Sequence, residues 1–188
     1  MLPALPASRG EVLAVAKFYE GEPHTVLLGR QATKEALLAA LPQRPARLRA
    51  LHVAAHAFVD PEHPRLSSLV LAGGQVLDVD AIHRLRVPAD VAVLSACSTG
   101  RGALLRGEGV LGFARGFFYA GVPRVVVSNW VVSDAQSATI LRRFHEKMVR
   151  EGLTAAAALR AAKLAALRSG GEAAHPFAWA PFVLWGLP

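Results

Sequence analysis

Short apolar segments alternate with amphipathic segments along most of the chain. The apolar segments are rich in Val and Leu and predict strands, at 24–28, 47–55, 68–72, 91–96, 124–130 and 182–186. Segments of helical pattern lie between them, at 11–19, 32–41, 107–121, 133–151 and 154–168, with a shorter one ending near Leu85. Continuously apolar strands that alternate with helices are typical of a mainly parallel sheet covered on both faces. The pattern therefore predicts a single α/β domain, a three-layer α/β/α sandwich.

Residues that favour helix ends support several of these boundaries. Ser8 and Glu11 have the spacing of a capping box, which predicts a helix that opens at this point. Asp78 or Asp80 can cap the short helix that ends near Leu85, the third along the chain. Gly121 is expected to end the predicted helix at 107–121.

Length and composition are those of a single-domain cytoplasmic protein. The 188 residues are enough to bury one core. No uncharged apolar run reaches the roughly 18 residues of a membrane span, and the first ten residues lack the basic stretch and long apolar core of a signal peptide. The single cysteine cannot form an internal disulfide and suits a reducing compartment. We expect a soluble, cytoplasmic protein with no membrane partner.

The net charge of +7 raises the alternative of a nucleic-acid-binding protein. Such a protein concentrates its Lys and Arg on one face or in one run. Here the densest group, Arg44, Arg47 and Arg49, lies in a connection interrupted by proline, and the other arginines are scattered. Nucleic-acid binding is therefore a minor alternative, which predicts that retention on DNA or RNA would depend steeply on salt.

The stretch VAVLSACSTG (91–100) contains the only cysteine, Cys97. An apolar strand leads into it, and in parallel sheets ligand-binding and catalytic residues collect at the carboxyl ends of the strands. The stretch HVAAHA likewise extends a strand to His56, and FVDPEHP then forms a loop. If these two strands are neighbours in the sheet, His56 and Cys97 come to lie side by side.

A histidine beside a cysteine would supply the chemistry of acyl transfer. A free thiol is mostly protonated at neutral pH, and His56 can accept its proton and later protonate the leaving amine. The backbone N–H groups of Ala57 and Cys97 are placed to stabilise the oxyanion. Each side chain taken alone has a simpler interpretation, His56 as a loop or hydrogen-bonded core histidine and Cys97 as a buried packing residue.

Two other motifs point only weakly to bound ligands. His52 and His56 have the H-x-x-x-H spacing that can bind zinc on a helix, but this stretch has the pattern of a strand and lacks the catalytic Glu. The G-x-G-x-x-G run at 107–112 contains Glu108, which would repel phosphate. We expect neither a metal nor an organic cofactor.

A series of longer motifs, taken in order, resembles the CHAT domains, which are caspase-like peptidase domains often fused to tetratricopeptide repeats in bacteria. The match around the cysteine is the closest, and together the motifs cover nearly the whole chain. They are LPASRGEVLAVAKFY, VLLGRQATKEAL, LHVAAHAFVDP, RLSSLVLAGG, VLSACSTGRG with GEGVLGFARGFFYAGVPRVVVSNWVVSD, and LTAAAALRAAKLAAL with HPFAWAPFVLWG.

The resemblance implies a caspase–hemoglobinase fold and a His–Cys dyad formed by His56 and Cys97. It implies a cysteine endopeptidase that cleaves protein or peptide substrates through a thioester acyl-enzyme. The segment from Trp130 to Asp134 is similar to one in the separases, and related peptidases hold a basic substrate side chain with an acidic group. This would place Asp134 in the first specificity pocket. An acid at the predicted start of a helix is also favourable for the helix alone, so both roles stay open for Asp134.

The chain departs from the family pattern in two respects. Ala57 stands where the family usually has glycine, and its Cβ could narrow the pocket or tilt the N–H donor. CHAT domains also begin with further strands, so the chain is expected to correspond to the C-terminal two-thirds of the domain. An open sheet edge would then be covered by a second copy of the chain or by a regulatory repeat or sensor domain. The alternative to an active peptidase is a catalytically silent binding or scaffold module of the same fold.

Overall fold

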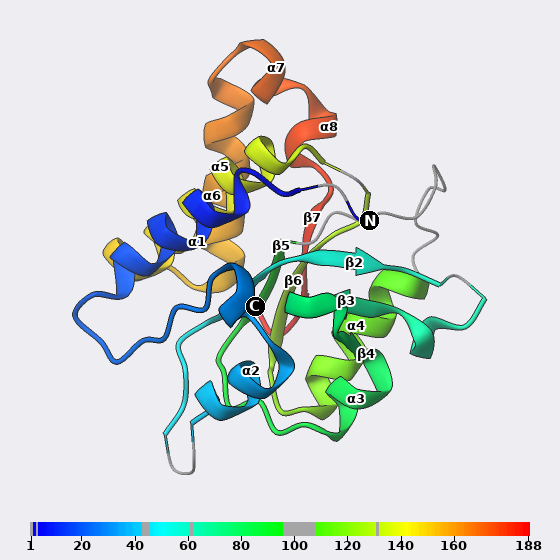
Figure 1. Cartoon of the computed structure of the whole chain (residues 1–188). Coiled ribbons are helices and arrows are strands. Elements are labelled where there is room, and N and C mark those ends of the chain that lie inside the picture. Colours follow the sequence, from blue (N-terminus) through cyan, green and yellow to red (C-terminus); the bar gives the residue numbers. More distant parts are fainter. Residues whose placement is uncertain (1, 3, 43–45, 61, 96–107, 131) are drawn as a thin grey trace.

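Two β-sheets organise the chain in the computed structural model, which describes residues 2, 4–42, 46–60, 62–95, 108–130 and 132–188 (Figure 1). The larger sheet has the strand order β1-β5-β6-β7, and the smaller has the order β2-β3-β4. Strands β1, β5 and β6 are parallel, β7 is antiparallel to β6, and the smaller sheet is antiparallel throughout. The strands are β1 (Leu51–Ala54), β2 (His56–Phe58), β3 (Ser68–Val70), β4 (Val76–Asp78), β5 (Ala92–Ser95), β6 (Arg124–Ser128) and β7 (Phe182–Gly186).

Helices cover both faces of the larger sheet, because successive residues of its strands face two different cores. In β5, Ala92 and Leu94 belong to a core shared with α3 and α4, whereas Val93 belongs to a core shared with α5 and α6. Helix α1 packs along α5 (Figure 1). This is the predicted three-layer α/β/α arrangement. The helices are α1 (Ser8–Ala16), α2 (Lys34–Ala40), α3 (Val79–Arg84), α4 (Glu108–Tyr119), α5 (Asp134–Arg150), α6 (Ala155–Arg168), α7 (Gly171–Ala174) and α8 (Pro176–Trp179), with short 3₁₀ turns at Lys17–Tyr19, Gly29–Gln31, Pro64–Leu66 and Ala72–Gly74.

Five of the helices within the described residues begin with a side-chain cap, and in α8 the cap is Nδ1 of His175, which accepts from the N–H of Phe177. Thr33, Asp78, Ser133 and Thr154 each accept a hydrogen bond from the backbone N–H three residues further on. Each cap satisfies one of the N–H groups that a helix start leaves without an intrahelical partner. The expectation that Asp78 or Asp80 caps the third helix is confirmed, with Asp78 in that role.

Two local predictions are wrong. Residues 24–28 form no strand and pair with none of the described strands, because an apolar β-branched segment becomes a strand only where a partner strand is available. The predicted capping box is also absent. Ala7 is the N-cap of α1, Ser8 donates its hydroxyl to the carbonyl of Leu5, and Glu11 turns into the protein interior.

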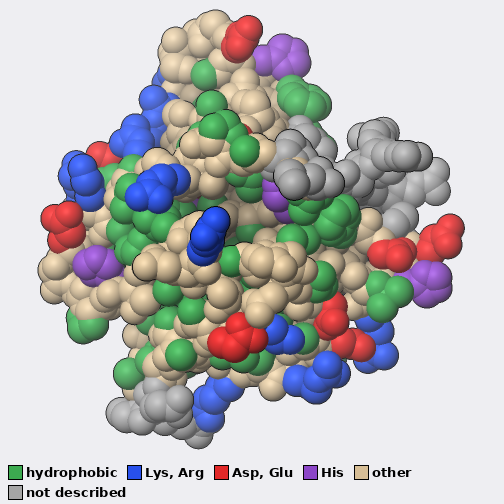
Figure 2. Space-filling model, viewed as in Figure 1, with side chains coloured by type: hydrophobic (Ala, Val, Ile, Leu, Met, Phe, Trp, Pro, Cys, Tyr) green, Lys and Arg blue, Asp and Glu red, His purple; other side chains and the backbone are tan. Residues whose placement is uncertain are grey.

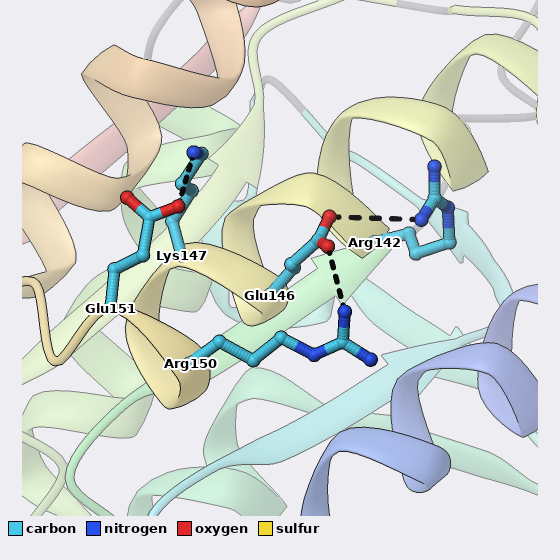
Figure 3. Close-up of polar contacts among 5 residues, drawn as sticks. All are labelled: Arg142, Glu146, Lys147, Arg150 and Glu151. Carbon is cyan, nitrogen blue, oxygen red and sulfur yellow. Dashed lines mark hydrogen bonds and ion pairs between the residues drawn. The ribbon is translucent and has the colours of Figure 1, made fainter.

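Charged side chains are dispersed over the surface. Figure 2 shows Lys and Arg at several separate places on one face, with Asp and Glu among them. On α5, Glu146 pairs with both Arg142 and Arg150, and Lys147 pairs with Glu151 (Figure 3). Exposed pairs four residues apart contribute only about 0.3–0.5 kcal/mol each to helix stability.

In the part of the chain that the structure describes, no helix is both long and apolar enough to cross a bilayer.

Candidate active site

Strands β1 and β5 are adjacent and parallel, and they end at the same level. Their register pairs Leu51 with Ala92 and Ala54 with Ser95, the last residue of each strand. In sequence, His56 follows Ala54 by two residues and Cys97 follows Ser95 by two residues. Cys97 itself lies outside the described residues. The adjacency that the dyad hypothesis requires of the two strands is therefore present.

His56 does not continue β1, contrary to the sequence interpretation. It begins β2, the first strand of the smaller antiparallel sheet, where it pairs with Val70. Its side chain is half-buried. The stretch HVAAHA has the pattern of one strand because its residues before and after Ala55 are both largely apolar. In the structure the chain leaves the larger sheet at Ala55 and enters the smaller sheet. His56 therefore lies in an antiparallel strand pair and not in a loop.

The ladder also determines where the N–H of Ala57 points. Leu71 donates to the carbonyl of Gln75 across β3 and β4, and hydrogen-bonded pairs alternate along an antiparallel ladder, so Leu69 directs its N–H and C=O toward β4. Ala57 pairs with Leu69 and therefore occupies a non-hydrogen-bonded position on β2. Because β2 is an edge of this sheet, the N–H of Ala57 points away from β3. That direction suits an oxyanion donor.

The methyl group of Ala57 packs into the core. Ala57 is 4% exposed and belongs to the same apolar cluster as Leu69 and Leu77. Successive side chains of a strand point to opposite faces, so the Cβ of Ala57 and the imidazole of His56 lie on different faces of β2. The methyl group that distinguishes Ala57 from a glycine is accommodated by the core and not by the face of β2 that carries His56.

Asp134 occupies the first turn of α5, directly after the capping residue Ser133. Its carboxylate oxygen Oδ2 accepts a hydrogen bond from the backbone N–H of Ala7, at 2.5 Å. The carboxylate is half-buried and holds the segment that precedes α1 against the start of α5. A structural role for Asp134 is therefore evident in the geometry, and a role in substrate binding stays a prediction.

A chain of buried polar side chains runs inward from the end of β5. The Ser95 hydroxyl donates to Glu11 Oε2 at 3.0 Å, and Glu11 Oε1 lies 3.0 Å from His52 Nε2. His52 Nδ1 then lies 3.1 Å from His145 Nε2, and His145 Nδ1 lies 2.8 Å from the Tyr19 hydroxyl. The sequence interpretation missed this network. The burial of Glu11 could have been inferred from its spacing of four residues from the apolar Val15, which places both residues on the same face of α1.

Burial determines the charge state of the inner histidine. His145 is completely buried, and this burial, together with the neighbouring His52, lowers its pKa well below the ordinary value. Burial also raises the pKa of Tyr19 to about 12. If Glu11 is a carboxylate and both histidines are neutral, one order of protons is compatible with these contacts. Tyr19 donates to His145, His145 donates to His52, and the Nε2–H of His52 faces Glu11.

The buried His145 should make the folded state sensitive to acid. The unfolded chain protonates this imidazole near pH 6.5 and the folded chain only at lower pH, so the unfolded state binds more protons below that value. The free energy of unfolding should therefore fall as the pH drops below about 6.5, by up to about 1.4 kcal/mol per pH unit from this group. In His145→Gln that component of the slope should disappear. Urea denaturation at a series of pH values measures it.

His63 provides the matched control for this measurement. Its imidazole is exposed and contacts only Asp60 among the described ion pairs. His63→Gln should retain the wild-type slope between pH 5 and 7. A His145→Gln protein with the wild-type slope would contradict the assignment of a neutral buried imidazole.

The described residues of both weak ligand motifs lie in strands or in a helix. His52 and His56 belong to different strands in different sheets. Gly112 lies within α4, where an added Cβ would come 3.0 Å from the carbonyl oxygen of Pro64, so close helix packing accounts for this glycine. Among the described residues, no group of three or more His, Cys, Asp or Glu side chains is arranged to hold a metal ion.

The chain belongs to the CHAT domain family. The family model matches residues 1–187. The fold described above, with its mainly parallel sheet between two helical layers, agrees with this assignment to a caspase-like family. No curated protein sequence gives a significant match to the chain.

Proposed function

We propose that the chain is a cysteine endopeptidase that cleaves protein substrates through a His56–Cys97 dyad. Cys97 attacks the scissile carbonyl carbon as its thiol proton passes to His56. The N–H groups of Ala57 and Cys97 stabilise the resulting oxyanion. The intermediate collapses to a thioester as the C–N bond breaks, and His56 gives its proton to the leaving amine. Water then attacks the thioester with His56 as the base, which releases the acid and restores the thiol.

The register of the larger sheet carries this proposal. Ala54 pairs with Ser95, so the segments that lead to His56 and Cys97 leave the sheet from paired positions on neighbouring strands. Such an edge is where parallel sheets place their reacting groups. The outward N–H of Ala57 and the core position of its methyl group support an intact oxyanion donor and weigh against a site spoiled by this alanine.

A cleavage profile of the purified chain on a peptide library tests the proposal, with Cys97→Ala as the control. We expect cleavage by the wild type and none by the variant. A thiol-directed acylating probe should also label Cys97 selectively at neutral pH. If the folded wild type neither cleaves nor reacts faster than a simple thiol, the chain is a silent binding module of the same fold.

We propose further that Asp134 contributes to recognition of a basic side chain just before the cleaved bond. A carboxylate at the start of α5 has the charge and partial burial that such a pocket requires. Asp134→Ala should lower kcat/KM for substrates with Lys or Arg at that position by about 10- to 100-fold. Loss of the hydrogen bond from Ala7 should also lower stability by about 1 kcal/mol. Cleavage profiles and denaturation curves measure the two effects.

Ser133→Ala is the matched control for Asp134→Ala. It removes the N-cap of the same helix and should cost a similar stability, about 0.5–2 kcal/mol. Its preference among substrates should stay that of the wild type. An Asp134→Ala protein with lowered stability and an unchanged cleavage profile would limit Asp134 to its structural role.

A further inference from the structure

One buried carboxylate joins the two strands that lead to the proposed dyad. Glu11 Oε2 accepts the hydrogen bond of Ser95, the last residue of β5, and Oε1 lies 3.0 Å from Nε2 of His52 in β1. The contact to His52 has the distance of an ion pair, but within the described residues neither atom has an aligned hydrogen-bond partner. Each oxygen of the same side chain thus contacts a different strand.

Stability alone does not account for a carboxylate at this position. Glu11 is 3% exposed and Ser95 is 8% exposed. Removing a carboxylate from water is costly, and apolar residues of similar size often stabilise a protein as well as a buried ion pair does. A buried polar network does, however, favour one geometry, because an alternative placement of the strands would separate the Ser95 hydroxyl from its acceptor on Glu11.

The N-cap residue of α1 also contacts the start of α5. Ala7 lies four residues before Glu11 in sequence, and its backbone N–H donates a hydrogen bond to the carboxylate of Asp134. The segment 7–11 therefore contacts β1, β5 and α5 together. In sequence, β1 precedes His56 of β2 and β5 precedes Cys97, and α5 contains Asp134.

We infer that Glu11 is a positioning residue, which sets the relative depth of the ends of β1 and β5 and so the approach of His56 to Cys97. This role rests on the proposed function, since the reaction gives the alignment its consequence. Glu11 touches no substrate and acts through Ser95 and His52. The charge of Glu11 matters less than its two oxygens. Gln in its place can accept from Ser95 with its amide oxygen. Its amide nitrogen can donate to Nε2 of His52 once the proton order of the network is reversed, so that His52 donates to His145 and His145 donates to Tyr19.

Substitutions at Glu11 separate positioning from packing. Glu11→Leu retains the volume and removes both polar contacts, whereas Glu11→Gln retains the shape and both contacts. We expect kcat to fall about 10- to 100-fold in Glu11→Leu with KM nearly unchanged, because misplacement of reacting groups slows the chemical step. Glu11→Gln should recover most of the loss. Glu146→Leu, at the partly exposed Glu146 of α5, is the control and should retain the wild-type kcat (Figure 3).

Hydrogen exchange measures the alignment itself, with or without catalysis. In Glu11→Leu, the amides of β1 and β5 should exchange at least about tenfold faster than in the wild type, because their local opening becomes easier. The amides of β7, which pairs with β6 at the opposite edge of the sheet from β1, should not change. If Glu11→Leu does not fold, Ser95→Ala removes one contact, and the same comparison is made for β5 alone.

The outcomes distinguish this inference from the proposed function. Unchanged exchange at β1 and β5 in Glu11→Leu would overturn the inference even if the wild type is an active peptidase. Faster exchange with an unchanged kcat would overturn it as well, since the alignment would then have no part in the reaction. If the wild type does not cleave but exchange at both strand ends still rises, the proposed function fails and Glu11 remains the residue that aligns the two strands.

Discussion

His56→Ala is expected to lower kcat/KM by at least about 10³-fold, because the variant has no group to take the thiol proton or to protonate the leaving amine. KM should change little, since the imidazole acts on the reacting bond and not on the remainder of the substrate. The fold should tolerate the change, because the side chain is half-buried and its strand is held by backbone pairing with Val70. Steady-state kinetics on the best substrate from the peptide library measure the effect.

His63→Ala is the control for this experiment. It lies seven residues further along the same region of the chain, with an exposed side chain near Asp60. It should cleave at the wild-type rate. If His56→Ala cleaves within tenfold of the wild type, His56 is not the base, and the proposed dyad is wrong.

Gly186→Ala should destabilise the fold by about 3–5 kcal/mol, the sum of backbone strain and overpacking. Gly186 ends β7 opposite Arg124 and has φ +102°, in the region that favours glycine. An added Cβ would overlap the carbonyl oxygen of Pro123 and lie 3.0 Å from Cε1 of Phe118. The next residue, Leu187, donates its N–H to that same carbonyl, so the backbone cannot move away without breaking this bond.

Gly10→Ala is the matched control for Gly186→Ala. It lies inside α1, and a Cβ there would meet no atom within 4 Å. Because alanine has the higher helix propensity, this variant should gain about 0.5–1 kcal/mol. Chemical denaturation gives both values. A free energy of unfolding within about 1 kcal/mol of the wild type in Gly186→Ala would show that the end of β7 is free to move.

Local patterns in the sequence determined most of the elements and their order. The apolar stretch 91–96 indicated a strand buried on both faces, and β5 has that character. Asp78 was recognisable as a possible helix cap, because a cap depends on residues only three positions apart. The motifs around the cysteine were specific enough to identify the CHAT family, which the match to residues 1–187 confirms.

The tertiary structure decided what depends on distant pairing. The pairing of β1 with β5 joins segments about 40 residues apart in sequence. Side-chain periodicity within each segment carries no information on which strand becomes its neighbour. His56 could be assigned to β2 only once β3 was in place to pair with it.

Glu11 shows the same limit most clearly. Its spacing from Ser8 indicated a capping box, and the fold instead turned its carboxylate toward Ser95 and His52. A local sequence motif indicates only which hydrogen bonds a side chain is able to make. The packing of α1 against β1 and β5 excludes water from Glu11 and decides which of them it does make.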